Sequence, residues 1–128
     1  MAERFGCSVA TVFHKIREGI DADVDTRNAQ RREAEGSYRF STVAKDNYVL
    51  VWLEGIGVIP NRRRKFVQNT NGVITALDDE DKEIVSATLT LNDAGECRLL
   101  VKGQEKEFWQ FRRMVLEGLL FGQIFPSS

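Results

Sequence analysis

The strongest constraint on the fold is a regular alternation of apolar and polar residues between positions 84 and 91. The apolar members are Val85, Ala87, Leu89 and Leu91, and the polar members between them are Ser86, Thr88 and Thr90. Because successive side chains of a β-strand point to opposite faces, this pattern predicts a strand with one buried and one solvated face. Such strands are typical of antiparallel sheets, so the fold must supply antiparallel neighbours.

Five further segments have strand-like patterns, and they cover residues 38–43, 47–53, 65–69, 73–77 and 97–102. The segment 47–53 is apolar on both of its alternating faces, which carry Tyr48, Leu50 and Trp52 on one side and Val49, Val51 and Leu53 on the other. A strand of this kind is predicted to lie in the middle of the sheet and to be covered on both sides. Between residues 65–69 and 73–77, Asn71 and Gly72 predict a hairpin with a type I′ turn, because both residue types accept a positive φ.

After Gly103 the apolar period changes from two residues to that of a helix. One apolar stripe within residues 104–121 consists of Phe108, Phe111, Val115 and Leu119, with Trp109, Leu116 and Leu120 beside it. The pattern predicts a long C-terminal helix that packs on the sheet. We also expect Trp109 and Trp52 to be mostly buried, with Gly122 as a plausible stop for the helix.

Residues 1–20 admit two interpretations. In the first, residues 1–5 and 9–19 are two helices separated by a tight turn at Gly6, Cys7 and Ser8. In the second, all twenty residues form one amphipathic helix, because apolar residues recur at steps of three and four. These apolar positions are Met1, Phe5, Val9, Val12, Phe13, Ile16 and Ile20. Residues 21–36 are almost wholly polar and are predicted to be a linker or a short helix.

The first interpretation rests on the order Phe5, Gly6, Ser8, Thr11 and Val12, which resembles the helix-turn-helix of bacterial and phage DNA-binding proteins. The resemblance covers residues 1–20. It implies that Ser8 caps the second helix. It also implies a set of residues facing the major groove of duplex DNA or its phosphates, namely Ala10, Thr11, His14 and Lys15.

Two charged clusters lie in the segment predicted to form the sheet. Arg62, Arg63 and Arg64 precede Lys65 and form the densest positive cluster, so they are candidates for binding phosphate. The alternative is a solvated strand edge that resists aggregation. The acidic run at residues 78–81 lacks the spacing of a calcium loop and is predicted to be a solvated turn. Because the net charge is only −1, any nucleic-acid binding must use a local patch.

The remaining chemistry-bearing residues give little support to catalysis or to a metal or cofactor site. Cys7 and Cys97 are far apart and outside any CxxC pattern, so two buried, reduced thiols are expected in a cytoplasmic protein. His14 is the only histidine and has no nucleophile motif beside it. No apolar run approaches the roughly 20 residues that a membrane span needs. The composition therefore favours a non-enzymatic, cytoplasmic protein without a cofactor.

The patterns together predict an α+β fold in one compact domain. It would contain an N-terminal helix or helix pair over residues 1–20, a polar linker or short helix over 21–36, and a twisted antiparallel sheet of about six strands with the C-terminal helix over 37–128. The functional hypothesis is a small DNA-binding regulator that uses the N-terminal segment and the basic loop. The alternative is a protein-interaction or small-ligand-binding module that forms a homodimer, with the N-terminal helix as ordinary core. The conformation at Gly6, Cys7 and Ser8 separates the two.

Overall fold

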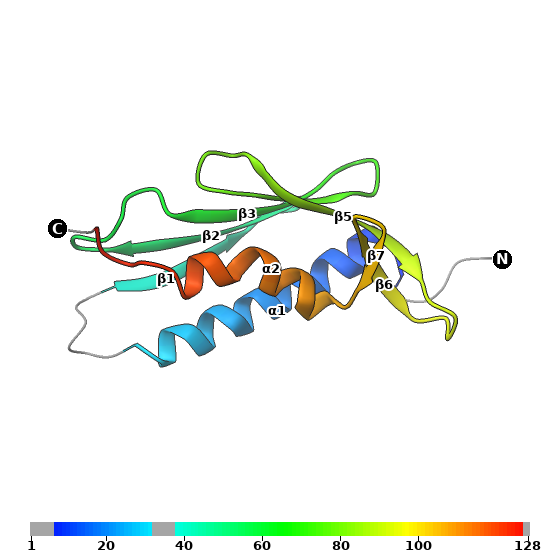
Figure 1. The fold of residues 1–128 in the computed structure, drawn as a ribbon, viewed down its shortest axis with the longest axis horizontal. Coiled ribbons are helices and arrows are strands. Elements are labelled where there is room, and N and C mark those ends of the chain that lie inside the picture. Colours follow the sequence, from blue (N-terminus) through cyan, green and yellow to red (C-terminus); the bar gives the residue numbers. More distant parts are fainter. Residues whose placement is uncertain (1–6, 32–37, 127–128) are drawn as a thin grey trace.

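The computed structural model describes residues 7–31 and 38–126, and within these ranges it contains two helices and one seven-stranded antiparallel sheet (Figure 1). The helices are α1 (Val9–Ala29) and α2 (Phe108–Leu120). The strands are β1 (Tyr38–Ala44), β2 (Tyr48–Gly55), β3 (Arg63–Gln68), β4 (Ile74–Leu77), β5 (Glu83–Leu91), β6 (Cys97–Val101) and β7 (Gln104–Lys106). Each strand pairs with the next one along the chain. The predicted α+β class and antiparallel sheet are confirmed.

Both helices pack on the same face of the sheet, and the other face is left open to solvent (Figure 1). On β2, Val49, Val51 and Leu53 point toward the helices and are buried, whereas the alternate side chains, including Trp52, are only half-buried. The prediction that β2 is covered on both sides is therefore wrong. Among the described elements, no second helical layer covers the outer face of β2. Side chains of the sheet itself cover part of that face, since the Lys65 Nζ lies over the Tyr48 ring, 4.6 Å from the ring centroid.

The predicted hairpin between β3 and β4 is present, but its turn is not type I′. Only Gly72 has a positive φ, of 84°, and Asn71 does not. The Gly72 amide donates to the Asn69 carbonyl at 3.3 Å, and the Asn69 amide donates to the Val73 carbonyl at 2.8 Å. This pattern is that of a longer hairpin loop in which a glycine in the left-handed region follows the tight turn.

Helix α1 begins at Val9, directly after Ser8, and continues to Ala29. Ser8 has an extended backbone, with a ψ of 157°. The interpretation of residues 1–20 as one continuous helix is therefore wrong at this position. A linker or separate short helix from residue 21 is also wrong over residues 21–29, because the inward apolar positions continue as far as Val24. The remaining residues of these two predictions, 1–6 and 32–36, lie outside the described part of the chain.

The C-terminal helix is shorter than predicted because residues 104–106 form β7 instead. Lys102 and Gly103 have positive φ values of 50° and 78°. A two-residue turn of the kind predicted at Asn71 and Gly72 is therefore found between β6 and β7 instead. Helix α2 then begins after Glu107, whose amide donates to the Gln110 side chain at 2.8 Å. The sequence concealed this hairpin because lysine is an uncommon residue at a positive φ.

A disulfide joins Cys7, just before α1, to Cys97 at the start of β6. The expectation of two reduced thiols is therefore wrong. The two cysteines are 90 positions apart in the sequence, and only the packing of the start of α1 beside β6 brings them together. Spacing along the chain could not reveal that contact.

We predict that reduction of this disulfide lowers the free energy of unfolding by about 2–5 kcal/mol, because the bond closes a long loop in the unfolded chain. Urea unfolding with and without dithiothreitol measures the effect. A protein carrying Cys7→Ser and Cys97→Ser should match the reduced protein and should not respond to the reductant. Equal stability of the oxidised and reduced wild type would contradict the prediction.

Candidate functional site

Two of the three arginines predicted to bind phosphate, Arg62 and Arg64, lie against the C-terminal half of α2. Arg64 donates through Nε to the Val115 carbonyl at 3.1 Å, and Arg62 donates through Nη2 to the Gly118 carbonyl at 3.1 Å. From α1, Arg27 donates through Nε to the last carbonyl of the helix, that of Leu120, at 2.6 Å. We call Arg27, Arg62 and Arg64 the arginine cluster.

The arginine cluster compensates the carbonyl end of a helix that has no basic residue in its own last turn. The guanidinium of Arg27 also lies 5.5–5.7 Å from the ring centroids of Tyr38, Phe40 and Phe121. These contacts join the end of α1, β1 and the end of α2 at one point. The cluster therefore fixes where α2 ends relative to the sheet.

Asp79, in the acidic turn between β4 and β5, forms ion pairs with two members of this cluster, Arg62 and Arg64. Its Oδ1 lies 3.0 Å from Arg64 Nη1 and accepts from the Arg63 amide at 2.8 Å. Its Oδ2 forms an ion pair with Arg62 Nε at 3.2 Å, without hydrogen-bond geometry. The side chains of Arg62 and Arg64 are only 18% and 13% exposed. The turn is thus more than a solvated acidic loop, and these arginines have a structural role.

The turn and the third arginine complete the charge pattern. Asp78 accepts from the amides of Lys82 and Glu80, and these hydrogen bonds hold the pKa of its carboxyl below the ordinary value of 3.8. Arg63 points to the other face of β3, where its Nη2 lies 3.0 Å from Asp81 Oδ2. All three arginines of the predicted phosphate patch are therefore paired with aspartates.

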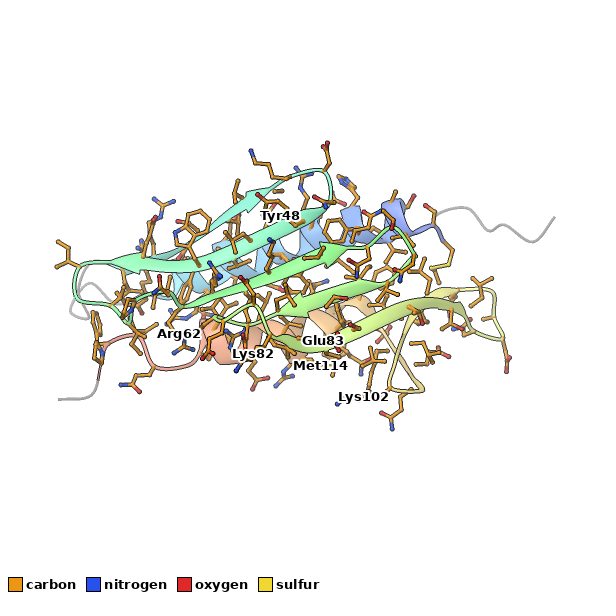
Figure 2. The ribbon with its side chains drawn as sticks, turned by 90° about the horizontal axis from the view of Figure 1, so that it is seen from above. Tyr48, Arg62, Lys82, Glu83, Lys102 and Met114 are labelled. Carbon is orange, nitrogen blue, oxygen red and sulfur yellow. A yellow bond between two sulfur atoms is a disulfide. The ribbon has the colours of Figure 1, made fainter. Side chains whose placement is uncertain are left out.

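The other predicted nucleic-acid contacts lie at the beginning of α1, toward the opposite end of the molecule from Arg62 (Figure 2). Ser8 accepts from the Thr11 amide at 3.2 Å and donates to the Thr11 hydroxyl at 2.9 Å. Thr11, His14 and Lys15 are exposed, and His14 Nε2 lies 3.6 Å from Glu18. The structure does not bring the two predicted groups together. The first helix of a helix-turn-helix would fall on residues 1–5, outside the described residues.

A polar hollow of about 430 Å³ lies beside the start of α1 and the turn between β1 and β2. It is lined by Ala10, Phe13, His14, Arg17, Ala44, Lys45, Asp46 and Gln68. Within the described ranges, Arg17 and Lys45 have no ion-pair partner. Neither residue is a candidate from the sequence, because the two are far apart in the chain and belong to no basic run.

The two helices run side by side in the same direction and approach closely near Gly19 (Figure 1). A β-carbon at Gly19 would overlap the guanidinium of Arg112, so the glycine leaves room for that side chain on α1. Arg112 Nε there donates to Asp23 Oδ2 at 2.9 Å. This ion pair holds α2 beside α1, and the Arg112 side chain over Gly19 contributes to the spacing of the two helices.

A groove of about 370 Å³ remains on the outer side of the two helices. It is lined by Asp23, Thr26, Arg27, Gln30, Trp109, Arg112, Arg113, Leu116, Glu117, Leu120 and Phe121. Trp109 is 48% exposed, so the prediction that it is buried is wrong. The apolar stripe of α2 is wider than the area that the sheet covers, and Trp109 lies at its uncovered margin, where its indole donates to Glu107 at 2.9 Å.

The outer crest of α2 has a regular composition. Trp109, Arg113, Glu117 and Phe121 follow one another at steps of four residues, and we call these four residues the α2 ridge. Arg113 Nε lies 3.1 Å from Glu117 Oε2, and both side chains are mostly exposed. Phe121 is 66% exposed. On the side away from α1, a second hollow of about 300 Å³ is lined by Lys106, Trp109, Gln110, Arg113, Met114 and Glu117.

The open face of the sheet has its own polar network. Glu54 accepts from the Ser41 hydroxyl at 2.6 Å and from the Trp52 indole at 3.2 Å, and Arg39 Nε lies 3.2 Å from the same carboxylate. The hydrogen bonds from Ser41 and Trp52 lower the pKa of Glu54 below its ordinary value of 4.5. Trp52 is thus half-buried on the solvent face and lies outside the core between sheet and helices.

Comparison with known proteins adds no assignment. No family model matches the chain, and neither the curated proteins nor the solved structures compared with it give a match. Within residues 7–31 and 38–126, no group of three or more histidine, cysteine or acidic side chains is placed to hold a metal ion. In the same ranges, no helix has the length and apolar character to cross a membrane.

We predict that Arg64→Met lowers the free energy of unfolding by about 1–3 kcal/mol, because it removes one of the two ion pairs of Asp79 and the side-chain donor to the Val115 carbonyl in a partly buried place. Arg113→Met is the matched control, since it removes an exposed ion pair of nearly the same length and should cost at most about 0.5 kcal/mol. Urea unfolding of both variants compares the two. Equal effects would contradict the structural role of the arginine cluster.

Proposed function

We infer that this protein is a non-enzymatic interaction module that binds a partner through the α2 ridge and the grooves beside it. The observation that carries the proposal is the exposure of large side chains on α2, where Trp109, Met114 and Phe121 are 48%, 46% and 66% exposed. They are spread along a helix whose inner face is covered by the sheet and α1, and the ion pair of Arg113 and Glu117 lies between Trp109 and Phe121. Large exposed apolar side chains bordered by polar residues are a feature of interaction sites on protein surfaces.

The composition of this surface supports a protein partner. Tryptophan, phenylalanine, methionine and arginine are the residue types enriched at protein interfaces, and all four occur here. The ion pairs on both sides are already made within the chain, by Arg112 with Asp23 and by Arg113 with Glu117. A partner would therefore gain affinity mainly from the aromatic groups and specificity from the charges.

A peptide library displayed on phage tests this proposal. Selection on the folded protein should enrich peptides with apolar anchors, and enrichment should be lost on a protein carrying Trp109→Ser and Phe121→Ser. Ile56→Ser is the control, because Ile56 is 89% exposed and lies in the turn after β2, away from α2. Enriched peptides that bind all three proteins equally would contradict the proposal.

The DNA-binding regulator remains a second candidate, supported by a different observation. Lys15, Arg17 and Lys45 near the start of α1 have no ion-pair partner among the described residues, and the first turn of α1 contains no acidic residue. Glu18 and Asp21 follow on exposed positions of the same helix, so a duplex would contact only its first turns. This candidate uses Ser8, Thr11, His14 and Lys15 but not the arginine cluster.

Fluorescence anisotropy with random duplex DNA at two salt concentrations tests this candidate. Weak binding should be lost as salt rises, and Lys15→Ala or Arg17→Ala should each reduce the salt slope by about one. Lys82→Ala is the control, because Lys82 lies in the turn between β4 and β5 and pairs with Glu80. Absence of salt-dependent binding, or equal effects of the three substitutions, would contradict DNA binding.

The cytoplasmic location stays a prediction from composition. The bond between Cys7 and Cys97 is an observation against it and supports an oxidising compartment, because disulfides are rare where thiol reductants are abundant.

A further inference from the structure

The α2 ridge is complementary to itself when its direction is reversed. Along the chain it presents an aromatic ring, a cation, an anion and an aromatic ring, in Trp109, Arg113, Glu117 and Phe121. Two such ridges placed antiparallel about a two-fold axis at the level of Val115 bring each residue opposite a suitable partner. Trp109 lies opposite Phe121 of the second copy, and Arg113 lies opposite Glu117 of the second copy.

The same symmetry repeats every contact, as in an isologous interface. The aromatic pair and the charge pair each form twice, and no cation faces a cation. In a parallel arrangement in the same register, Arg113 would face Arg113 and Glu117 would face Glu117. The order of the ridge therefore favours one orientation of two copies.

The surface beside the ridge has the shape that helix packing requires. Helices pack when the ridge formed by residues at steps of four enters a groove of the neighbour. The α2 ridge stands between the groove of about 370 Å³ on the α1 side and the hollow of about 300 Å³ near Met114. The groove on the α1 side, which Leu116 and Leu120 help to line, can receive an aromatic end of the ridge of a second copy.

We propose that a second copy of this chain occupies the α2 ridge, in a two-fold dimer with antiparallel α2 helices. This inference rests on the proposed interaction function and names its partner. The aromatic residues at the ends supply apolar contact, and the central charges fix orientation and register. The arginine cluster and the Asp23–Arg112 pair hold each ridge in place before the copies meet.

Sedimentation velocity of the oxidised protein over a hundredfold range of concentration tests the proposal. The wild type should shift from monomer toward dimer as concentration rises. Arg113→Glu places two pairs of glutamates opposite each other, and Glu117→Arg places two pairs of arginines opposite each other. Each variant should weaken the dimer about tenfold or more while leaving the monomer folded, because both positions are exposed.

The single reversals test the orientation, because in a parallel arrangement like charges already face each other in the wild type and reversal would only exchange one like pair for another. Mixing then tests whether the loss comes from charges that face each other across the interface. The Arg113→Glu and Glu117→Arg proteins should form a heterodimer with each other, because every central pair is again attractive in the antiparallel arrangement. The double variant Arg113→Glu with Glu117→Arg should likewise regain the homodimer. Circular dichroism of each variant checks that the monomer has kept its helix content.

The outcomes separate this inference from the function on which it rests. A wild type that stays monomeric but selects ridge-dependent peptides would overturn the dimer and leave the interaction module. A wild type that stays monomeric and selects no such peptides would overturn both. A dimer that the two charge reversals leave unchanged, or that mixing does not restore, would overturn the antiparallel α2 interface.

Discussion

The contact on which the rest of the structure depends is the one between three arginine side chains and the carbonyl end of α2. Arg27 comes from α1, and Arg62 and Arg64 come from the start of β3, so the contact joins elements that are far apart in the sequence. Asp79 pairs with Arg62 and Arg64, and this shared ion pair stabilises the two guanidinium groups where they lie mostly out of water. Without these donors the last carbonyls of α2 would need water or a different helix end.

This anchoring has a consequence for the surface. The sheet has one helical layer only, and α2 lies beside α1 with its covered face fixed by Phe111, Val115 and Leu119. The apolar stripe of α2 is wider than the contact that the sheet and α1 provide. The excess, which includes Trp109 and Phe121, therefore lies outside the core, and it forms the ridge to which we assign partner binding.

Periodicity predicted the parts of the fold that depend on local pattern, such as β5 with its alternation and the hairpin before Ile74. Periodicity could not predict which face of β2 the helices would cover, because both faces are apolar, with Val51 on one and Trp52 on the other. Nor could it predict the disulfide of Cys7 or the pairing of Arg64 with Asp79, since these depend on tertiary packing. Of the α2 ridge, the sequence singles out only Trp109, and predicts it to be buried. Its exposure follows from the absence of any described element over the outer side of α2.

The most direct test of this account is amide hydrogen exchange along α2 in the wild type and in a protein carrying Arg62→Met and Arg64→Met. If the arginine cluster holds the end of the helix, amides of residues 117–121 should exchange much faster in the variant, while those of residues 111–114 change little. Arg39→Met, which removes an exposed ion pair on the open face of the sheet, should leave the pattern as in the wild type. Unchanged exchange at residues 117–121 in the double variant would contradict the account.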